Sequence, residues 1–213
     1  RTAQLIIGIA AWILLIPAAL LVRQAPPAED AATGSAAAPR MTALQALRSR
    51  PFIVLSATFF FCCATHSGPI FHTVSYAVTC GIPMIAAVSI YSVEGLAGMF
   101  GRIGFGVMGD RFGAQRVLVA GLLAQAFGVL AYVFVGQLGG FYAVAMLVGF
   151  IYAGVMPLYA VIIRENFPLK MMGTIIGGTA MAGSLGMSTG PLVGGLIYDN
   201  LASYQWLYIM SWG

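Results

Sequence analysis

The sequence has 213 residues, of which 60% are hydrophobic and only 8% charged, and its mean hydropathy is +0.93. A soluble globular domain carries roughly 25% charged residues, so this chain is predicted to be an integral membrane protein rather than a water-soluble one. Its net charge of +4 does not indicate nucleic-acid binding, because the cations lie between apolar runs and not on one amphipathic face.

Six apolar segments reach the length of about 20 residues that a membrane-spanning helix needs, and a seventh begins near the end of the chain. They are residues 3–22, 51–77, 84–108, 116–135, 141–163 and 172–198, with the last beginning near Tyr204. Residues 23–50 are rich in Ala, Pro and Gly and are predicted to be a flexible linker, whose end at 41–49 fits a short surface helix. Because Arg1 directly precedes one apolar run and Gly213 falls within another, we expect a piece of a longer protein.

Apart from Arg102, Lys and Arg follow an alternation between the gaps that separate these segments. The gaps that hold them contain Arg23, Arg40, Arg48, Arg50, Arg111, Arg116, Arg164 and Lys170. The gaps at residues 73–83, 136–140 and 199–203 contain none, and only Arg1 falls on their side. Since cytoplasmic loops carry the excess of Lys and Arg, the linker and the Asp110–Arg111 turn are predicted to be cytoplasmic.

Arg102 is a cation inside an apolar segment, eight residues before Asp110 and so roughly 12 Å inside the membrane. A charge at that depth costs at least about 2.5–3.5 kcal/mol and usually faces a cavity or a partner. A guanidinium there suits bidentate capture of a carboxylate, so Arg102 is predicted to bind substrate, with a structural ion pair as the alternative. Glu94, about 80° around the same helix, could share the cavity and either carry a coupled proton or balance Arg102.

The segment at residues 51–77 contains two histidines, His66 and His72, which are six residues apart and so lie on different helix faces. Either could hydrogen-bond substrate or relay a proton, and the alternative is a contact between helices. His66 is the deeper and is preferred as a substrate-binding residue. Tyr152, between Gly149 and Gly154, is predicted to line the same cavity.

Other aromatic residues fall into two groups. Further hydroxyls within the membrane come from Tyr76, Tyr91 and Tyr159. Interfacial anchors are predicted at Tyr198, Tyr204 and Trp206.

The segment at residues 172–198 carries small residues at three- and four-residue spacing. They are Gly173, Gly177, Ala180, Gly183, Gly186, Gly190 and Gly194. Gly177, Gly183, Gly186, Gly190 and Gly194 are predicted to form a helix-packing face on which two helices touch and slide, and Pro191 favours a bend.

No catalytic motif of the nucleophile-elbow, zinc-protease or P-loop type is present in the sequence, and an enzyme is not expected. Cys62, Cys63 and Cys80 form neither a CxxC pair nor a zinc spacing, so they are predicted to be apolar helix residues. We expect no cofactor and no metal.

Residues 101–116, GRIGFGVMGDRFGAQR, resemble the cytoplasmic signature of the major facilitator superfamily, G-x-x-x-D-R-x-G-x-R/K. The matching residues are Gly106, Asp110, Arg111 and Gly113, with Arg116 three positions further on instead of two. The family carries a weaker copy of this signature between helices 8 and 9, and the linker at residues 23–50 is similar to its central loop. The resemblance implies an all-α polytopic bundle comprising helices 6 to 12 of a twelve-helix fold, with the last cut short. It assigns residues 1–22 to helix 6 and residues 51–213 to the C-terminal bundle.

The pattern G-R-x-x-x-G-x-x-x-D is similar to that of the monocarboxylate and oxalate/formate porters, whose helix 8 carries a substrate-binding arginine at the position of Arg102. Mammalian members place an aspartate at the position of Gly98, and residues 173–198 lack the second cation of the oxalate exchanger. The resemblance therefore favours a substrate with a single carboxylate.

These observations predict a secondary transporter of the plasma membrane, such as a bacterial inner membrane. It would move a small organic anion, a monocarboxylate, by alternating access with proton symport or anion exchange. Its partners would be the lipid bilayer, the anion, protons or a counter-anion, and a missing N-terminal half, while Asp110, Arg111 and Arg116 would form a cytoplasmic charge lock. The alternatives are an exporter of apolar drugs or neutral solutes, with Arg102 structural, and a transporter-like sensor that binds ligand without moving it.

Overall fold

The computed structural model describes residues 9, 13, 16–17, 42–201 and 203–212. The chain divides into two units, Arg1–Arg40 and Met41–Gly213, and the architecture below is that of the second. Most of the predicted span at residues 3–22 and of the linker at 23–50 falls outside the described residues, so both stay predictions.

The described part of the second unit is built from helices, as the apolar segments predicted. In chain order they are α2 (Ala43–Leu47), α3 (Arg50–Thr79), α4 (Met84–Phe112), α5 (Ala114–Ala131), η1 (Tyr132–Phe134), α6 (Leu138–Asn166), η2 (Leu169–Met171), α7 (Met172–Leu201) and α8 (Gln205–Trp212). The predicted spans from residue 51 onward begin and end within four residues of these helices, and α2 confirms the short helix expected at 41–49.

Local sequence signals set several helix ends. Thr42 and Gln45 form a reciprocal capping box at the start of α2, and the Ser49 hydroxyl accepts a hydrogen bond from the Phe52 amide at the start of α3. Gly113 alone separates α4 from α5, and its φ of +91° is a conformation that residues with a Cβ rarely adopt. This glycine of the signature therefore makes the tight turn between the two helices.

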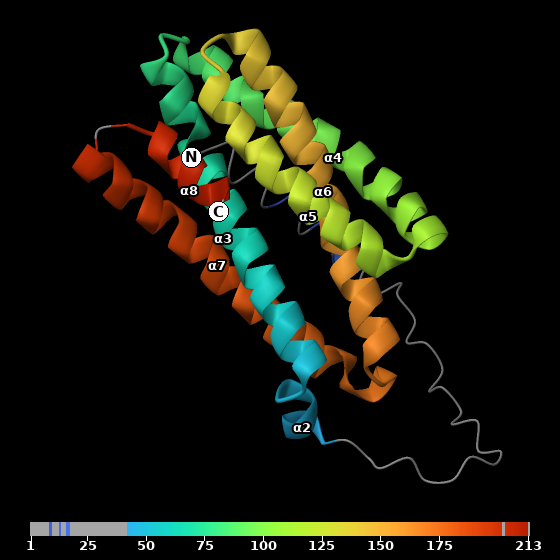
Figure 1. Cartoon of the computed structure of the whole chain (residues 1–213). Helices are drawn as coiled ribbons and strands as arrows, with labels where there is room; N and C mark the ends of the chain where they lie inside the picture. Colours follow the sequence, from blue (N-terminus) through green and yellow to red (C-terminus); the bar gives the residue numbers. More distant parts are fainter. Residues whose placement is uncertain (1–8, 10–12, 14–15, 18–41, 202, 213) are drawn as a thin grey trace, which may run out of the picture. The chain divides into compact units, whose positions relative to one another are not determined.

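Two closely packed helix pairs dominate the bundle, α3 with α7 and α4 with α6. Figure 1 shows α3 and α7 running side by side, with α4, α5 and α6 grouped beside them. The short α8 contacts α3, α5 and α7, and α3 also contacts α4 and α6. A bilayer supplies no hydrophobic force between helices, so close packing of small residues holds such pairs together.

The α3–α7 contact runs along the predicted glycine stripe. A Cβ placed on Gly183, Gly186, Gly190 or Gly194 would come within 3.0 Å of atoms of α3, so each of these glycines allows the close approach. A Cβ on Gly177 would meet nothing within 4 Å among the described residues, so its packing role stays a prediction for contacts with other parts of the protein. The stripe drifts off the contact face toward the start of α7.

The α4–α6 contact uses glycines from both helices. A Cβ on Gly98 would lie 2.9 Å from the Ala153 Cβ, and one on Gly101 would overlap the backbone of Phe150. On α6, a Cβ on Gly149 would lie 2.7 Å from the Glu94 Cγ. These glycines bring the two helix backbones together around the position of Glu94.

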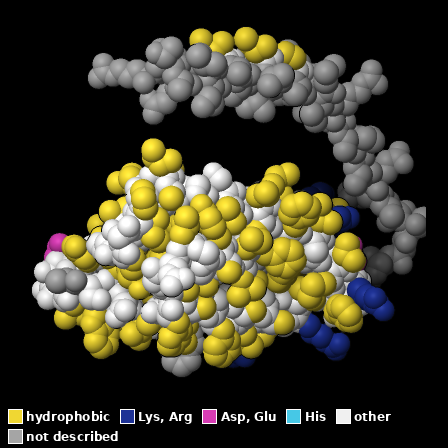
Figure 2. Space-filling view, turned by 90° about the horizontal axis from the view of Figure 1, so that it is seen from above, with side chains coloured by type: hydrophobic (Ala, Val, Ile, Leu, Met, Phe, Trp, Pro, Cys, Tyr) yellow, Lys and Arg dark blue, Asp and Glu magenta, His cyan; other side chains and the backbone are white. Residues whose placement is uncertain are grey.

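Five helices of the described chain are long and apolar enough to cross a membrane: Arg50–Thr79, Met84–Phe112, Ala114–Phe134, Leu138–Asn166 and Leu169–Leu201. Large apolar side chains are exposed on them, among them Ile85 and Phe134 at 89% and 84%. Figure 2 shows the apolar side chains along the flank and most of the visible Lys and Arg side chains at one end. Both features suit a bundle surrounded by lipid.

We expect Gly190→Ala and Gly177→Ala to change stability in opposite directions. The first places a methyl group against the α3 backbone and should lower the free energy of unfolding by about 1–3 kcal/mol. The second adds a methyl group in open space and should raise it by roughly 0.5–1 kcal/mol, because alanine favours helix more than glycine. Thermal unfolding in detergent micelles measures both, and equal shifts would contradict this account of the α3–α7 contact.

Candidate functional site

A cavity of about 430 Å³ opens between α3, α4 and α6. It is lined by His66 and Ile70 of α3, by Tyr91, Glu94, Gly95, Gly98, Met99 and Arg102 of α4, and by Gly149, Tyr152 and Ala153 of α6. The structure thus brings together all four residues that the sequence predicted for substrate binding and proton coupling. Their assignment to a function stays a prediction.

His66 lies at the inner wall of this cavity with only 1% of its surface exposed. Its ring stacks on the Tyr152 ring, with centroids 3.4 Å apart and an interplanar angle of 9°. Its Nε2 is 3.7 Å from the Glu94 Oε1, and neither ring nitrogen has a hydrogen-bond partner among the described residues. That separation is longer than a hydrogen bond, so neither nitrogen of the His66 ring is hydrogen-bonded to a described residue.

Glu94 is 8% exposed and is held at the α4–α6 contact, where Gly149 leaves room for its side chain. Arg102 is exposed and lines the other end of the same cavity, two turns further along α4. No ion pair within the part of the chain that the structure describes includes Arg102. The expected arrangement, two charges in one cavity without direct contact, is therefore present.

The second histidine has a different setting. The His72 Nε2 lies 3.3 Å from the Pro191 carbonyl oxygen of α7, and its ring packs on Tyr204 at 5.3 Å. Pro191 has no amide hydrogen and so interrupts the hydrogen bonding within α7. The contact with His72 joins α3 to α7 at this residue. His72 therefore forms a contact between helices, which was the alternative hypothesis for the two histidines.

The other tyrosines mostly hold helices together. The Tyr91 hydroxyl donates to the Ile70 carbonyl oxygen of α3 while its side chain lines the cavity. Tyr76 packs in an aromatic cluster with Phe141 and Tyr208. Tyr159 packs on Phe59 at 4.5 Å.

The predicted interfacial anchors lie at one end of the bundle, near the start of α8. Tyr198 stacks on Tyr204 with ring centroids 4.2 Å apart, and Trp206 is 51% exposed. Their position beside the cation-free gap at residues 199–203 is consistent with an interfacial role, which stays a prediction.

The signature turn lies at the end of the bundle that carries the cations. Asp110, Arg111 and Arg116 are all exposed, and the Arg111 guanidinium carbon lies 5.5 Å from the Phe112 ring centroid. Within residues 42–201 and 203–212 no ion pair includes Asp110, and a Cβ on Gly106 would meet nothing within 4 Å. The charge lock is not formed within the described chain, and it stays a prediction for contacts with other parts of the protein.

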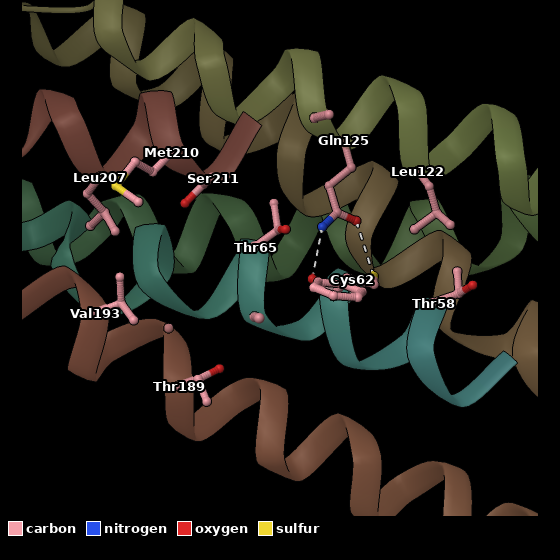
Figure 3. A pocket seen from close by; sticks show the side chains of 14 residues that line it. Thr58, Cys62, Thr65, Leu122, Gln125, Thr189, Val193, Leu207, Met210 and Ser211 are labelled. Atoms are coloured by element: carbon pink, nitrogen blue, oxygen red, sulfur yellow. Dashed lines mark hydrogen bonds between the residues drawn. The ribbon is translucent and has the colours of Figure 1, made fainter. Parts of the chain in front are cut away.

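A second cavity of about 470 Å³, which the sequence did not indicate, lies between α3, α5, α7 and α8. Figure 3 shows Gln125 of α5 pointing to Cys62 of α3. The Gln125 Nε2 donates to the Cys62 carbonyl oxygen at 3.3 Å, and the Cys62 thiol donates to the Gln125 Oε1 at 3.6 Å. The sequence feature that could have indicated this contact is Gln125, the single side-chain amide in the apolar run at residues 117–131. Because the amide is satisfied and no charge lines this cavity, the cavity of His66 and Glu94 is the stronger candidate site.

The chain matches the sequence family described as Major Facilitator Superfamily over residues 1–191, and it therefore belongs to that superfamily. This membership confirms the resemblance at the level of the superfamily. It also confirms the prediction that the chain is not an enzyme, since the family consists of transporters. With five candidate spans, the chain is a multi-pass membrane protein.

Three relatives give the range of similarity. The MFS-type transporter YuxJ of Bacillus subtilis is 27% identical over 121 residues, which cover 57% of this chain and 31% of the relative. The MFS-type transporter MJ1560 of Methanocaldococcus jannaschii is 30% identical over 124 residues, 58% of this chain and 32% of the relative. The multidrug resistance protein MdtG of Proteus mirabilis is 29% identical over 111 residues, 52% of this chain and 28% of the relative. The chain thus spans about a third of the length of these relatives, and none of their names mentions a monocarboxylate.

We expect His66 and Glu94 to be energetically coupled. In a double-mutant cycle, His66→Phe keeps the stacked ring and Glu94→Gln keeps the side-chain shape, so the cycle isolates their polar interaction. The change in the free energy of unfolding of the double variant should differ from the sum of the two single-variant changes by at least about 0.5 kcal/mol, measured by chemical denaturation in micelles. The control cycle pairs His72→Phe with Glu94→Gln and should be additive, because His72 contacts α7 instead. Equal deviations in both cycles would contradict the coupling.

Proposed function

We propose that this chain is the C-terminal part of a secondary transporter that moves a small organic anion, a monocarboxylate, by alternating access. The observation that carries the proposal is the cavity between α3, α4 and α6, where Arg102 shares one wall with Glu94. Arg102 would bind the carboxylate, while His66 and Tyr152 would contact the rest of the substrate. An N-terminal half would complete the cavity and rock against this bundle.

The physical argument rests on the cost of a cation within a membrane-spanning helix. Arg102 lines a cavity and has no ion pair with the described residues, so its charge is not compensated there. A planar guanidinium forms two parallel hydrogen bonds with a carboxylate, and these bonds are stronger where water is scarce. A bound anion would remove the cost that Arg102 imposes on the empty site.

Glu94 supplies a means of coupling. Its carboxyl group is 8% exposed and has His66 beside it, so a proton bound there would remove a costly buried charge. A protonated Glu94 would also spare a bound carboxylate the repulsion of a second anion. We therefore propose proton symport through Glu94, with anion exchange as the mode in which no proton moves.

The place of the chain in a twelve-helix transporter is part of the proposal. Helices α3 to α7 would correspond to helices 7 to 11 and α8 to the beginning of helix 12, with residues 1–22 as helix 6 and 23–50 as the central loop. The end of the bundle that carries the cations would face the cytoplasm of a bacterial inner membrane, by the charge rule for short loops. The signature turn at residues 106–116 would contact the other half there.

A second candidate function is export of apolar drugs or neutral solutes. It is favoured by the similarity to MdtG, whose name describes multidrug resistance, and by apolar lining residues such as Ile70 and Met99. Arg102 would then be structural, and its replacement would leave transport of a neutral substrate intact.

Arg102→Gln is expected to reduce uptake of radiolabelled lactate or a similar acid in vesicles that contain the full-length transporter. Losing the charged hydrogen bonds should cost about 2 kcal/mol or more, which is roughly a 30-fold loss of affinity. The matched control is Arg164→Gln, an exposed arginine at the end of α6. Unchanged acid uptake in Arg102→Gln would remove this residue from the site, and equal transport of a neutral drug would favour the second candidate function.

Glu94→Gln is expected to separate exchange from accumulation. The amide cannot release a proton, so an imposed pH gradient should no longer drive the acid into vesicles above its external concentration. Exchange of internal for external labelled acid should continue, because Arg102 is intact. Accumulation that still follows the pH gradient in this variant would place the coupled proton elsewhere.

A further inference from the structure

The candidate cavity carries one charged side chain at each end. Glu94 and Arg102 are eight residues apart on α4, so their Cα atoms are separated by roughly 12 Å along the helix axis. No ion pair joins them, and they are the charged side chains among the described lining residues. The empty cavity is therefore an electric dipole, with the cation at one end and the anion at the other.

The Glu94 end has hydrogen-bonding capacity that nothing described uses. His66 is 1% exposed, it lines the cavity, and both of its ring nitrogens lack a partner. The Glu94 carboxylate is 3.7 Å from the nearer nitrogen, and no hydrogen bond to it is formed by the described residues. Buried polar groups normally have partners, so two unsatisfied neighbours aimed into one cavity point to a polar group of a ligand.

The wall between the two ends is open and suits an extended ligand. A Cβ on Gly95 would meet nothing within 4 Å, so the cavity reaches the α4 backbone there. Ile70 and the stacked Tyr152 provide apolar and aromatic surface beside it. A volume of about 430 Å³ lies within the roughly 300–1,000 Å³ of pockets for drug-sized ligands and exceeds what a three-carbon acid fills.

A lone carboxylate at Arg102 would leave the other end of this cavity unsatisfied. We propose that the preferred substrate is amphoteric, with a carboxylate that binds Arg102 and an ammonium group that binds Glu94 beside His66. This inference rests on the proposed function, since it uses the same site and the same role for Arg102. It changes the substrate class from a simple monocarboxylate to an extended amino acid whose two charges lie at opposite ends.

The chemistry of the Glu94 end suits an ammonium group. The carboxylate and a neutral His66 nitrogen both accept hydrogen bonds, and an ammonium group offers three donors. The aromatic face of Tyr152 lies beside them, and such faces attract cations. With both ends occupied, each charge of the cavity has a counter-charge in the ligand.

An ammonium group and a coupled proton would compete for Glu94, because each neutralises the same carboxylate. The titratable or charged groups near Glu94 among the described residues are His66 from α3, Tyr91 and Arg102 from α4, Tyr132 from η1 and Tyr152 from α6. Binding of an amphoteric ligand should therefore exclude a proton from Glu94. A plain acid should instead bind best together with a proton on Glu94, because the carboxylate would otherwise repel the second anion.

The test compares three ligands of similar length. The first, 6-aminohexanoate, carries a carboxylate and an ammonium group, whereas hexanoate carries only the carboxylate and hexylamine only the ammonium group. Binding to the purified full-length transporter in micelles is measured by titration calorimetry between about pH 6 and 8, where the carboxylate and ammonium groups stay charged. We expect 6-aminohexanoate to bind about tenfold more tightly than either single-charge ligand. These comparisons use the unmodified protein and do not depend on the folding of a variant.

Two variants then assign the two ends. Glu94→Gln should abolish the preference for 6-aminohexanoate over hexanoate, and Arg102→Gln should weaken both acids. The matched controls are Glu165→Gln and Arg164→Gln, which change exposed residues at the end of α6 and should leave binding unchanged.

The outcomes separate this inference from the proposed function. If hexanoate binds as tightly as 6-aminohexanoate and both depend on Arg102, the amphoteric substrate is excluded while the carboxylate site stands. If 6-aminohexanoate binds more tightly but Glu94→Gln keeps that preference, the ammonium group lies elsewhere and the inference fails. Binding that is insensitive to Arg102→Gln, or no binding of either acid, overturns both.

Discussion

The close approach of α4 to α6 through glycine is the constraint on which the rest of the site depends. Gly101 brings α4 against the α6 backbone, and Gly149 leaves space for the Glu94 side chain between the two helices. A larger residue at Gly149 would occupy the position of Glu94 itself. Because lipid does not drive helices together, this contact between small residues sets the separation of the helices and with it the width of the cavity.

Buried polar groups in this bundle are of two kinds. Most have partners, as Gln125 does with Cys62, and these join neighbouring helices. His66 and Glu94 face each other across a gap longer than a hydrogen bond. The hydroxyls of Ser56 and Tyr159 also lack a partner among the described residues, but they do not line this cavity. Unused polarity that faces a cavity is what distinguishes the site of His66 and Glu94 from the larger cavity beside α8.

Much of the fold could be predicted because its signals are local. The apolar runs predicted where helices lie, and the residues that cap or end two of them, Ser49 and Gly113, act on their immediate neighbours in the chain. The site was partly predictable for the same reason, since a period of 3.6 residues places Glu94 and Arg102 within reach of one cavity. The repeat along α7 could not show which of its glycines lie against α3, and Gly177 does not contact α3 although Gly183, Gly186, Gly190 and Gly194 do.

The sequence by itself determined that this is a membrane protein, that its loop cations gather at one end, and that the apolar part of α4 before the Asp110–Arg111 turn carries two opposite charges. Composition and periodicity are enough for these features, because each depends on residues close together in the chain. Only the tertiary structure decided that His66, rather than His72, stands beside Glu94, and that Tyr152 stacks on it. These contacts join three helices, and the pairing of helices depends on how their whole surfaces fit together, which no single segment encodes.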